Sequence, residues 1–462
     1  MTASSFANLG LPVALFDNLA SLGYQQMTPI QAQALPPILA GADLIGQAQT
    51  GSGKTAAFGL CLLTKLDTRV SDIQSLVLCP TRELADQVAE EIRRLARGIP
   101  NVRVLTLCGG IPKRKQTAAL QHGAHIVVGT PGRVEDHLRN ASLALPALTT
   151  LVLDEADRML DMGFQDALEA IVEHLPVARQ TLLFSATFPA AIQATAERAL
   201  KNPVTVRVET GNDAARITEH YYRVASEAQR LTALRQLLLH FSSASTLVFC
   251  STRQAVKEVT QSLASHGFSV LALHGELEQM DRERTLARFA NRSIAVLVAT
   301  DVAARGLDID ALDLVINYHV AFEPEGHVHR IGRTGRAGNS GLACTLFSDE
   351  EAHRIARLEG TGDPLRDAEP LPPQTVLDQS PVQPDMATLE IYAGRKQKLR
   401  PGDILGALTG VNGIAGDQVG KIQLFALRSY VAVRHDAIRS ALRKLSDGKL
   451  KGRSYRARLL GN

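Results

Sequence analysis

The 462-residue sequence contains no apolar run that approaches the roughly 18 residues needed to cross a bilayer. Its first ten residues, MTASSFANLG, also lack the basic patch and apolar stretch of a secretory signal peptide. Neither a membrane-spanning protein nor a secreted one is indicated. We expect a cytoplasmic protein of two to four domains with no membrane partner.

Cysteine is scarce, and its five positions form no CxxC pair. Each adjoins apolar residues, and they are Cys61, Cys79, Cys108, Cys250 and Cys344. This pattern argues against a disulfide framework and against a cysteine metal site. We predict five reduced thiols in hydrophobic cores.

Net charge is also low, at +3, but the two signs are unevenly distributed. From Asp385 to the end there are 15 Lys and Arg against 6 Asp and Glu, a net charge of +9. The remainder holds 35 against 41, a net charge of −6. A basic terminal module on a mildly acidic body favours a polyanionic partner. A surface that is basic only for solubility is the alternative.

Three segments recur along the chain in the same order. LVLCPTRELADQV from Leu76 matches LVFCSTRQAVKEV from Leu247, at an offset of 171 residues. VLTLCGG and HIVVGT then match VLALHGE and AVLVAT. Short apolar strands that alternate with helices indicate a parallel sheet covered on both faces. The repeat therefore predicts two tandem α/β domains, with polar turns gathered at the carboxyl ends of their strands.

The composition divides the chain into four parts. We expect a first domain over 1–208 and a second over 216–360. Residues 361–385 are rich in proline and predict a semi-rigid linker. The basic module would occupy 386–462.

The segment AQTGSGKT lies between an expected strand and an expected helix and resembles a phosphate-binding loop. Two glycines would let backbone N–H groups approach phosphate, Lys54 would reach the outer phosphates, and Thr55 would hold Mg²⁺. Ala48 replaces the usual first glycine. The expected ATP contacts of the loop are Ala48, Gln49, Thr50, Gly51, Ser52, Gly53, Lys54 and Thr55.

An apolar strand runs directly into carboxylates in LVLDEADRML, residues 151–160. A helix start would explain acidic residues there. The phosphate loop roughly 100 residues upstream favours magnesium instead, with Asp154 facing the ion, partly through water. Glu155 would orient the attacking water and take its proton.

With GSGKT and DEAD in one domain, residues 6–350 resemble a DEAD-box RNA helicase, whose two domains are RecA-like. The resemblance implies an ATP-dependent, RNA-stimulated hydrolase. GYQQMTPIQ at 23–31 matches the adenine-binding Q motif, with Met27 where proline is usual, so Gln31 and the isolated Phe6 would contact ATP. SAT at 185–187 matches the element that couples hydrolysis to unwinding, through Ser185 and Thr187.

The same resemblance implies residues that contact the RNA backbone in both domains. In the first they are Pro80, Thr81, Arg82, Gly109, Gly110, Thr130 and Arg133. In the second they are Thr252, Arg253, Gln279, Arg282 and Thr300. HRIGRTGR would supply arginine fingers at Arg333 and Arg336, and Asp308 would lie near the ribose.

The tail reads as strand, helix, strand, strand, helix, strand, an order that suits an RNA-recognition-motif-like α+β fold. It resembles the C-terminal domain of the DbpA subfamily, which acts on a hairpin of the large-subunit ribosomal RNA. Alternation predicts that Leu389, Ile391, Val431 and Val433 face inward and that Tyr392, Tyr430 and Arg434 face outward. With few aromatic residues for base stacking, we expect a basic RNA surface at Arg395, Lys396, Lys398, Arg400, Lys449, Lys451 and Arg453.

The sequence thus predicts a DEAD-box RNA helicase that uses ATP and Mg²⁺ and is directed to 23S rRNA during 50S subunit assembly. A generic helicase in mRNA turnover or cold response, an ATP-gated RNA-binding scaffold and a DNA helicase remain alternatives. A monomer is favoured over an oligomer.

Overall fold

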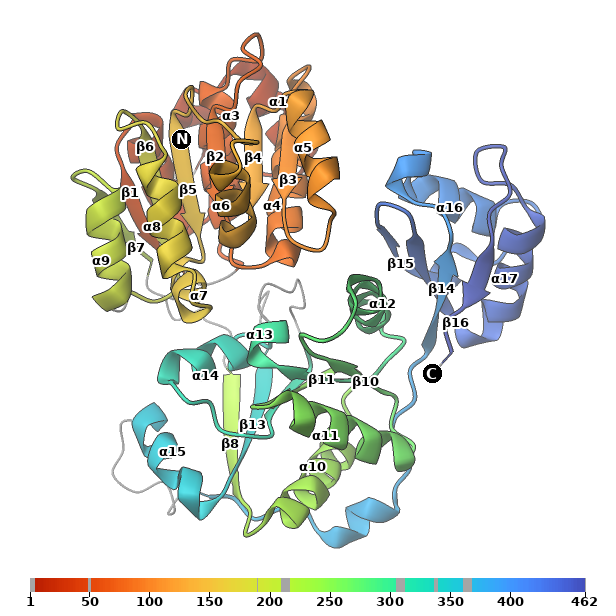
Figure 1. The fold of residues 1–462 in the computed structure, drawn as a ribbon. Helices are drawn as coiled ribbons and strands as arrows, with labels where there is room; N and C mark the ends of the chain where they lie inside the picture. The colour runs from red at the N-terminus through yellow and green to blue at the C-terminus, as the bar shows by residue number, and fades with distance from the viewer. Residues whose placement is uncertain are drawn as a thin grey trace. The chain divides into compact units, whose positions relative to one another are not determined.

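The computed structural model describes residues 5–48, 51–188, 190–208, 217–304, 312–335, 340–359 and 368–461. The chain divides into two compact units, of which the first is built on one parallel sheet (Figure 1). Its seven strands lie in the order β3 (Val104–Leu107), β4 (Ile126–Gly129), β2 (Ser75–Leu78), β5 (Thr150–Asp154), β6 (Gln180–Ser185), β1 (Leu44–Gln47) and β7 (Val204–Arg207).

Hydrophobic cores cover both faces of this sheet, because neighbouring residues of a strand point to opposite sides. In β2, Val77 belongs to one core and Leu76 to the other. The first core is closed by α1 (Val13–Ser21), α2 (Pro29–Leu39), α3 (Lys54–Lys65) and α4 (Arg82–Leu95). The second is closed by α6 (Pro131–Arg139), α7 (Ala156–Asp161), α8 (Gln165–Glu173) and α9 (Ala190–Ala199). Helix α5 (Lys113–Gln121) follows β3.

The second unit begins with another parallel sheet, which confirms the predicted repeat. Its six strands lie in the order β10 (Val270–Leu273), β11 (Val296–Thr300), β9 (Thr246–Cys250), β12 (Leu314–Asn317), β13 (Gly341–Phe347) and β8 (Ile217–Arg223). This is the order of β3-β4-β2-β5-β6-β1 in the first sheet. Its helices are α10 (Glu227–Phe241), α11 (Arg253–Ser265), α12 (Gln279–Ala290), α13 (Asp301–Ala304), α14 (Pro324–Ile331) and α15 (Ala352–Glu359).

The basic module forms a four-stranded antiparallel sheet with two helices, in the predicted order of elements. The strands lie in the order β15 (Val419–Leu424), β16 (Ser429–Arg434), β14 (Met386–Ile391) and β17 (Ala457–Leu459), with helices α16 (Pro401–Thr409) and α17 (Ile438–Asp447). The four residues predicted to face inward are all fully buried in its core, and they are Leu389, Ile391, Val431 and Val433. The predicted fold class is therefore confirmed for all three parts.

The described part of the proline-rich segment packs onto the second domain. A short 3-10 helix, Gln374–Asp378, places Val376 in the hydrophobic core beside α10. The side chain of Gln236 donates a hydrogen bond to the Pro372 carbonyl at 2.6 Å. This stretch of the expected semi-rigid linker therefore lies against the surface of the second domain.

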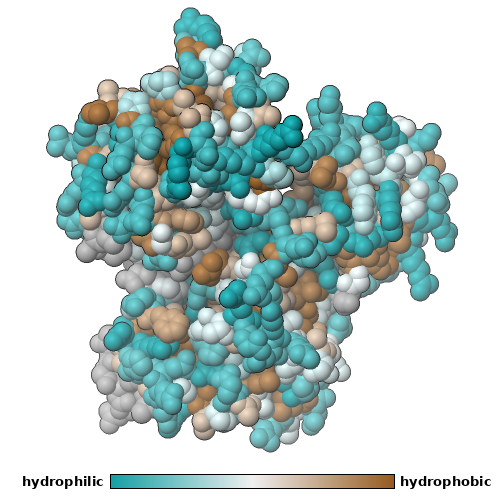
Figure 2. Space-filling view, in the orientation of Figure 1, coloured by the Kyte–Doolittle hydropathy of each residue, from teal (hydrophilic) through white to brown (hydrophobic). Residues whose placement is uncertain are grey.

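The face of the molecule shown in Figure 2 is mostly hydrophilic, with hydrophobic residues scattered among polar ones. Within the described residues, no helix combines the length and apolar character needed to cross a membrane. All five cysteines are buried and free, which confirms the prediction of reduced core thiols.

Candidate nucleotide and RNA site

The strand order of the first sheet separates two groups of motifs. Strands β5, β6 and β1 are neighbours, and their carboxyl ends lead into DEAD, SAT and the phosphate loop. Strands β3, β4 and β2 are also neighbours, and theirs lead into the GG pair, TPGR and PTRELA. Because all seven strands are parallel, these segments share one edge of the sheet.

The phosphate loop depends on glycine for its shape. Gly51 and Gly53 have φ angles of 83° and 95°, which favour glycine. A Cβ atom on Gly53 would lie 2.5 Å from the Gln31 side chain. Lys54 begins α3, and its buried ammonium group donates a hydrogen bond to the Ala48 carbonyl at 2.7 Å. The ammonium is thus held above the loop, where an outer phosphate would meet it.

The Q motif contacts the same loop. Gln31 accepts a hydrogen bond from the Thr28 backbone N–H at 2.9 Å and donates one to the Gly53 carbonyl at 3.1 Å. Phe6 is buried, and its ring meets Tyr24 edge-on with centroids 6.2 Å apart. Gln31 therefore connects the start of α2 with the phosphate loop, a contact that the sequence could not reveal.

Asp154 ends β5 and is buried. Burial raises its pKa to about 7, the Lys54 ammonium opposes the rise, and the Glu155 carboxylate adds to it. Its Oδ1 atom is buried and has no hydrogen-bond partner among the described residues. A buried carboxylate oxygen without a partner beside a phosphate loop fits a Mg²⁺ ion, which prefers oxygen ligands and usually also binds phosphate.

Glu155 has a left-handed backbone, with φ of 52°, at the point where β5 turns into α7. Its carboxylate accepts a hydrogen bond from Arg158 at 3.0 Å, and both side chains are buried. No sequence motif had pointed to a role for Arg158. Its guanidinium partly neutralises the second carboxylate of DEAD and holds its orientation.

Asp157, the third carboxylate, binds the SAT segment. One of its oxygens accepts hydrogen bonds from the backbone N–H groups of Ala186 and Thr187, at 3.1 and 2.9 Å, and from the Thr187 hydroxyl at 3.0 Å. The Ser185 hydroxyl accepts from the Asp157 backbone N–H at 3.3 Å and donates to the Thr187 carbonyl at 2.6 Å. Asp157 therefore links the DEAD turn directly to the predicted coupling element, although no sequence motif had indicated a role for it.

The predicted RNA residues of the first domain lie together at the other half of the sheet edge. Thr81 caps α4, accepting a hydrogen bond from the Leu84 N–H at 3.3 Å, and follows the buried Pro80. The Arg82 side chain lies across the GG turn, because Cβ atoms on Gly109 and Gly110 would approach it to 2.8 and 2.1 Å. The paired glycines thus make room for this arginine.

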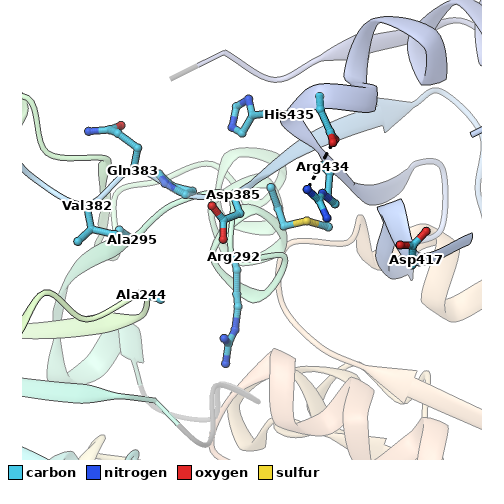
Figure 3. Close-up of a pocket in the computed structure, with 12 residues that line it drawn as sticks. Ala244, Arg292, Ala295, Val382, Gln383, Asp385, Asp417, Arg434 and His435 are labelled. Carbon is cyan, nitrogen blue, oxygen red and sulfur yellow. Dashed lines mark ion pairs between the residues drawn. The ribbon is translucent and has the colours of Figure 1, made fainter. Parts of the chain in front are cut away.

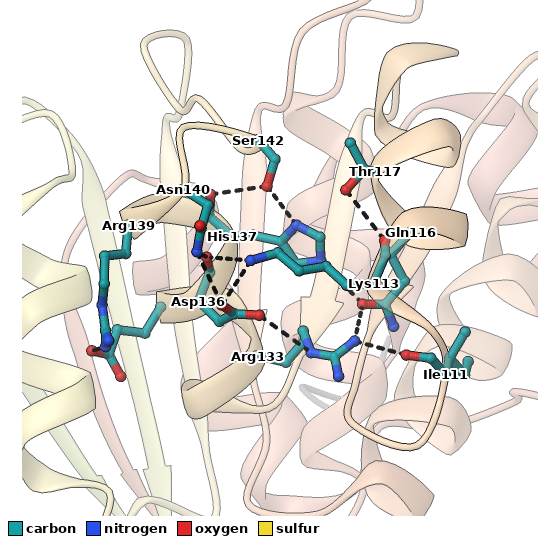
Figure 4. A network of polar contacts seen from close by, with 11 residues as sticks. Ile111, Lys113, Gln116, Thr117, Arg133, Asp136, His137, Arg139, Asn140 and Ser142 are labelled. Atoms are coloured by element: carbon teal, nitrogen blue, oxygen red, sulfur yellow. Dashed lines mark hydrogen bonds and ion pairs between the residues drawn. The ribbon is translucent and has the colours of Figure 1, made fainter.

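Arg133, in the TPGR segment that begins at Thr130, joins the same region through the network in Figure 4. Its guanidinium donates to the Ile111 carbonyl at 2.9 Å and to the Gln116 amide oxygen at 2.7 Å. Ile111 directly follows the GG pair, so this contact fixes two of the predicted RNA motifs relative to each other.

The second domain repeats the arrangement at the ends of β9, β10 and β11. Thr252 caps α11, and the next residue, Arg253, donates to Glu276 at 2.9 Å. Arg282 in α12 donates to the Ala303 carbonyl at 2.8 Å, three residues after Thr300. Gln279 is the first residue of α12. The predicted RNA residues of this domain therefore also lie at one sheet edge.

The segment HRIGRTGR contains a buried arginine that the sequence did not single out. Arg330 binds both oxygens of Asp301, at 2.6 and 2.7 Å, and donates to the His319 carbonyl at 2.7 Å. Arg333 is buried in the turn after α14. Four of the predicted residues of the ATP site lie outside the described residues, and they are Gln49, Thr50, Asp308 and Arg336.

In the basic module, Tyr430 lies on the outer face of the sheet as alternation predicts, but it is not exposed to solvent. It is fully buried, whereas Tyr392 is half-buried and Arg434 exposed. The seven predicted basic residues are all exposed on two loops, 395–400 and 449–453. The loops touch, because Lys451 donates to the Lys398 carbonyl at 2.5 Å. They form one surface, called here the basic loop surface.

Three family descriptions match the chain in sequence. They are the DEAD/DEAH box helicase over residues 28–195, the helicase conserved C-terminal domain over 229–338 and the DbpA RNA binding domain over 388–459. The ATP-dependent RNA helicase DbpA of Escherichia coli K12 is 50% identical over 460 residues, with 100% of both chains covered. The CshA helicase of Bacillus cereus is 43% identical over 358 residues, covering 78% of this chain and 68% of the relative.

The fold also matches a solved helicase complex. Dbp5 of Saccharomyces cerevisiae, bound to RNA and ADP BeF3, superposes with a TM-score of 0.70 at 31% identity, covering 79% of this chain and 94% of the other. The two helicase matches, the DbpA RNA binding domain and the full-length relative agree with one another. The chain belongs to the DEAD-box ATP-dependent RNA helicases, and it is an RNA-dependent ATPase of the DbpA type.

Proposed function

We propose that the basic loop surface directs this helicase to a hairpin of 23S rRNA during assembly of the 50S subunit. One observation supports the proposal most strongly. Seven exposed basic residues lie together on two touching loops, in a module that matches the DbpA RNA binding domain. Contacts of the helicase core to the RNA backbone carry no sequence information. Selectivity must then come from a separate surface, and the module provides one.

The nucleotide site would bind ATP as follows. Lys54 leaves the Ala48 carbonyl for the outer phosphates, while Gln31 and Phe6 hold the adenine end. Thr55 and Asp154 would hold Mg²⁺, which neutralises developing phosphate charge. Glu155 takes the proton of the attacking water. The orphaned Oδ1 atom of Asp154 is the structural support for the metal.

The second domain would complete this site with Arg333 and Arg336, and Asp308 would contact the ribose. Arginine fingers of this kind contribute roughly 10³–10⁵ in rate. RNA would be gripped by the residues that follow β2, β3 and β4 and by those that follow β9, β10 and β11. A strand gripped by its backbone and bent can no longer pair, so the local duplex opens, and hydrolysis releases it.

The enzyme would act as a monomer in the cytoplasm, where it meets assembling ribosomal particles. Its proposed preference can be tested by binding to fragments that tile total ribosomal RNA. One 23S fragment should bind more tightly than fragments of 16S rRNA, with a salt slope of about −0.7 per phosphate neutralised. Replacing Lys398, Lys451 and Arg453 with glutamine should remove the preference. Equal affinity of the unaltered protein for all fragments would leave a generic RNA helicase.

A further inference from the structure

The outer face of the module's sheet is not open. Thr388 and Glu390 of β14 and Tyr430 of β16 lie on the face opposite the module's core, yet each is at most 1% exposed. Helix α12 of the helicase domain lies against this face, since residues on and just beyond it donate hydrogen bonds to Thr388 and Glu390. The centre of the sheet is therefore already occupied by another part of the same chain.

Glu390 stands at the middle of this contact, with three arginines around its carboxylate. Arg428 and Arg458 belong to the module and donate to its two oxygens at 2.6 and 2.7 Å. Arg284 belongs to α12 and donates from Nε to Oε1 at 3.2 Å. Arg284 is also held by Asp281 of its own helix, at 2.9 Å. One buried carboxylate thus joins two folded domains.

Thr388 provides a second, neutral contact beside this ion cluster. Its hydroxyl accepts a hydrogen bond from the Asn291 amide at 3.2 Å and lies 2.7 Å from the Ser293 hydroxyl. All three side chains are buried. Charged and neutral contacts therefore fix the position of β14 along the end of α12 at two separate points.

The charge of Glu390 matters because the carboxylate has no exposed surface. Burial alone would raise its pKa, but hydrogen bonds from Arg458, Arg284 and Arg428 hold the pKa below its usual value of 4.5. Removing one partner of a buried ion pair strongly destabilises the folded arrangement, because the remaining charge stays buried. The cluster therefore favours one arrangement of the two domains.

Helix α12 also carries predicted RNA contacts of the core. It begins at Gln279, and Arg282 lies two residues before Arg284. Arg282 and Arg284 lie two residues apart in the same helix, so a contact that holds Arg284 in place also fixes the position of Arg282. The same helix thus connects the sheet of the module with the RNA-gripping edge of the second domain.

We propose that the Arg284–Glu390 pair is a positioning contact that makes the module a fixed extension of α12, so that a bound hairpin presents its flanking duplex to the core in one geometry. The inference rests on the proposed function for its RNA ligand. The docked sheet face leaves no room for base stacking at its centre, which agrees with hairpin binding on the basic loop surface. Arg284 positions RNA through Glu390 and contacts neither ATP nor RNA itself.

The test compares full-length variants. Arg284→Gln removes the helicase side of the cluster and leaves Glu390 with its two arginine partners inside the module. Arg292→Gln is the matched control, because it removes the same charge just beyond α12 from an exposed residue with no contact to Glu390. Arg292 lines a cavity of about 910 Å³ between the helicase domain and the module, together with Asp385 and Arg434 (Figure 3).

The first readout needs no RNA. Spin labels on cysteines introduced at exposed Gln261 of α11 and Ser446 of α17 report the separation of the two domains. A narrow distance distribution is expected for the parent chain and for Arg292→Gln, and a broad one for Arg284→Gln. A broad distribution in the parent chain, or a narrow one in Arg284→Gln, would overturn the inference whatever RNA the module binds.

The second readout is ATP hydrolysis with the 23S fragment that binds best, carrying a flanking duplex. Arg284→Gln should bind this fragment like the parent chain, but its turnover at saturating fragment should fall at least about five-fold. Turnover with excess unrelated RNA should be unchanged, which a merely unfolded variant would not show. Thr388→Val, which removes the neutral contact, should move both readouts in the same direction. Parent-like turnover in both variants would refute the positioning role, whereas a parent chain without fragment preference would refute the proposed function instead.

Discussion

The Asp157 carboxylate accepts two hydrogen bonds from Thr187, one from the backbone N–H at 2.9 Å and one from the hydroxyl at 3.0 Å. The two residues belong to different motifs: Asp157 lies at the start of α7, which follows β5, and Thr187 lies just after β6. The two hydrogen bonds therefore join the DEAD turn directly to the SAT segment.

Thr187→Val should reduce duplex unwinding much more than it reduces ATP hydrolysis. The substitution preserves shape but removes the hydroxyl bond to a charged acceptor, which contributes about 1.5–3 kcal/mol. RNA-stimulated hydrolysis should stay within a few-fold, while unwinding of a short duplex should fall about ten-fold or more. Thr205→Val, the same change on an exposed strand, is the control. Equal losses of hydrolysis and unwinding would argue against coupling through this bond.

Glu155→Gln should remove hydrolysis but keep binding of ATP and RNA. The amide oxygen can still accept the hydrogen bond from Arg158, so the turn should stay in place. It cannot take a proton, and loss of a general base costs about 10²–10⁴ in rate. Single-turnover hydrolysis and nucleotide affinity measure the two effects, with the exposed Glu173→Gln as control. Hydrolysis near that of the control would rule out the proposed role.

The five cysteines should resist thiol reagents in the folded protein. Burial raises the pKa of Cys61 to about 11 and that of Cys108 to about 12, and it raises the pKa of Cys79, Cys250 and Cys344 as well. The reactive species is the thiolate, which burial disfavours. Titration should find close to no rapidly reacting thiol in the native chain and all five after denaturation. Rapid reaction of a native thiol would contradict the core packing.

The Glu390 cluster should stabilise the protein in a pH-dependent way. Its pKa in the folded protein is lowered, so its contribution is fully present above the unfolded value of about 4.5 and is lost as pH falls through the lower folded value. The difference in melting temperature between the parent chain and Glu390→Gln should therefore be largest near pH 7 and shrink below about pH 4. A difference that grew on acidification would contradict this charge state.

The sequence was sufficient for the parts of the structure that depend on local patterns. The repeat around Leu76 and Leu247 predicted two similar sheets, because short apolar strands that alternate with helices indicate a parallel sheet covered on both faces. The phosphate loop and the strand that ends at Asp154 were also predicted to lie at one edge of a sheet, because parallel strands end at the same edge. Alternation in the tail correctly placed Leu389 and Val431 in the core.

Contacts between separate segments could not be obtained in this way. Alternation shows that Tyr430 lies opposite the core, but it does not show that α12 covers that face. Gln31 against Gly53, and Arg158 against Glu155, depend on turns whose geometry the sequence does not specify. Glu390 did leave a signal, as the one acidic residue in an apolar strand of a basic segment that carries a net charge of +9 from Asp385 onward. A buried carboxylate there required cationic partners, although the sequence could not show that one of them, Arg284, comes from another domain.

The central proposal is that the module selects the RNA on which the core acts. The most direct measurement is ATP hydrolysis as a function of RNA concentration, for the full-length chain and for a chain without residues 385–462. Each is assayed with the best 23S fragment and with unrelated RNA. The full-length chain should reach half-maximal activity at a far lower concentration of the fragment, and the shortened chain should respond to both RNAs alike while still hydrolysing ATP at high RNA concentration. Equal stimulation of the full-length chain by both RNAs at every concentration would contradict the proposal.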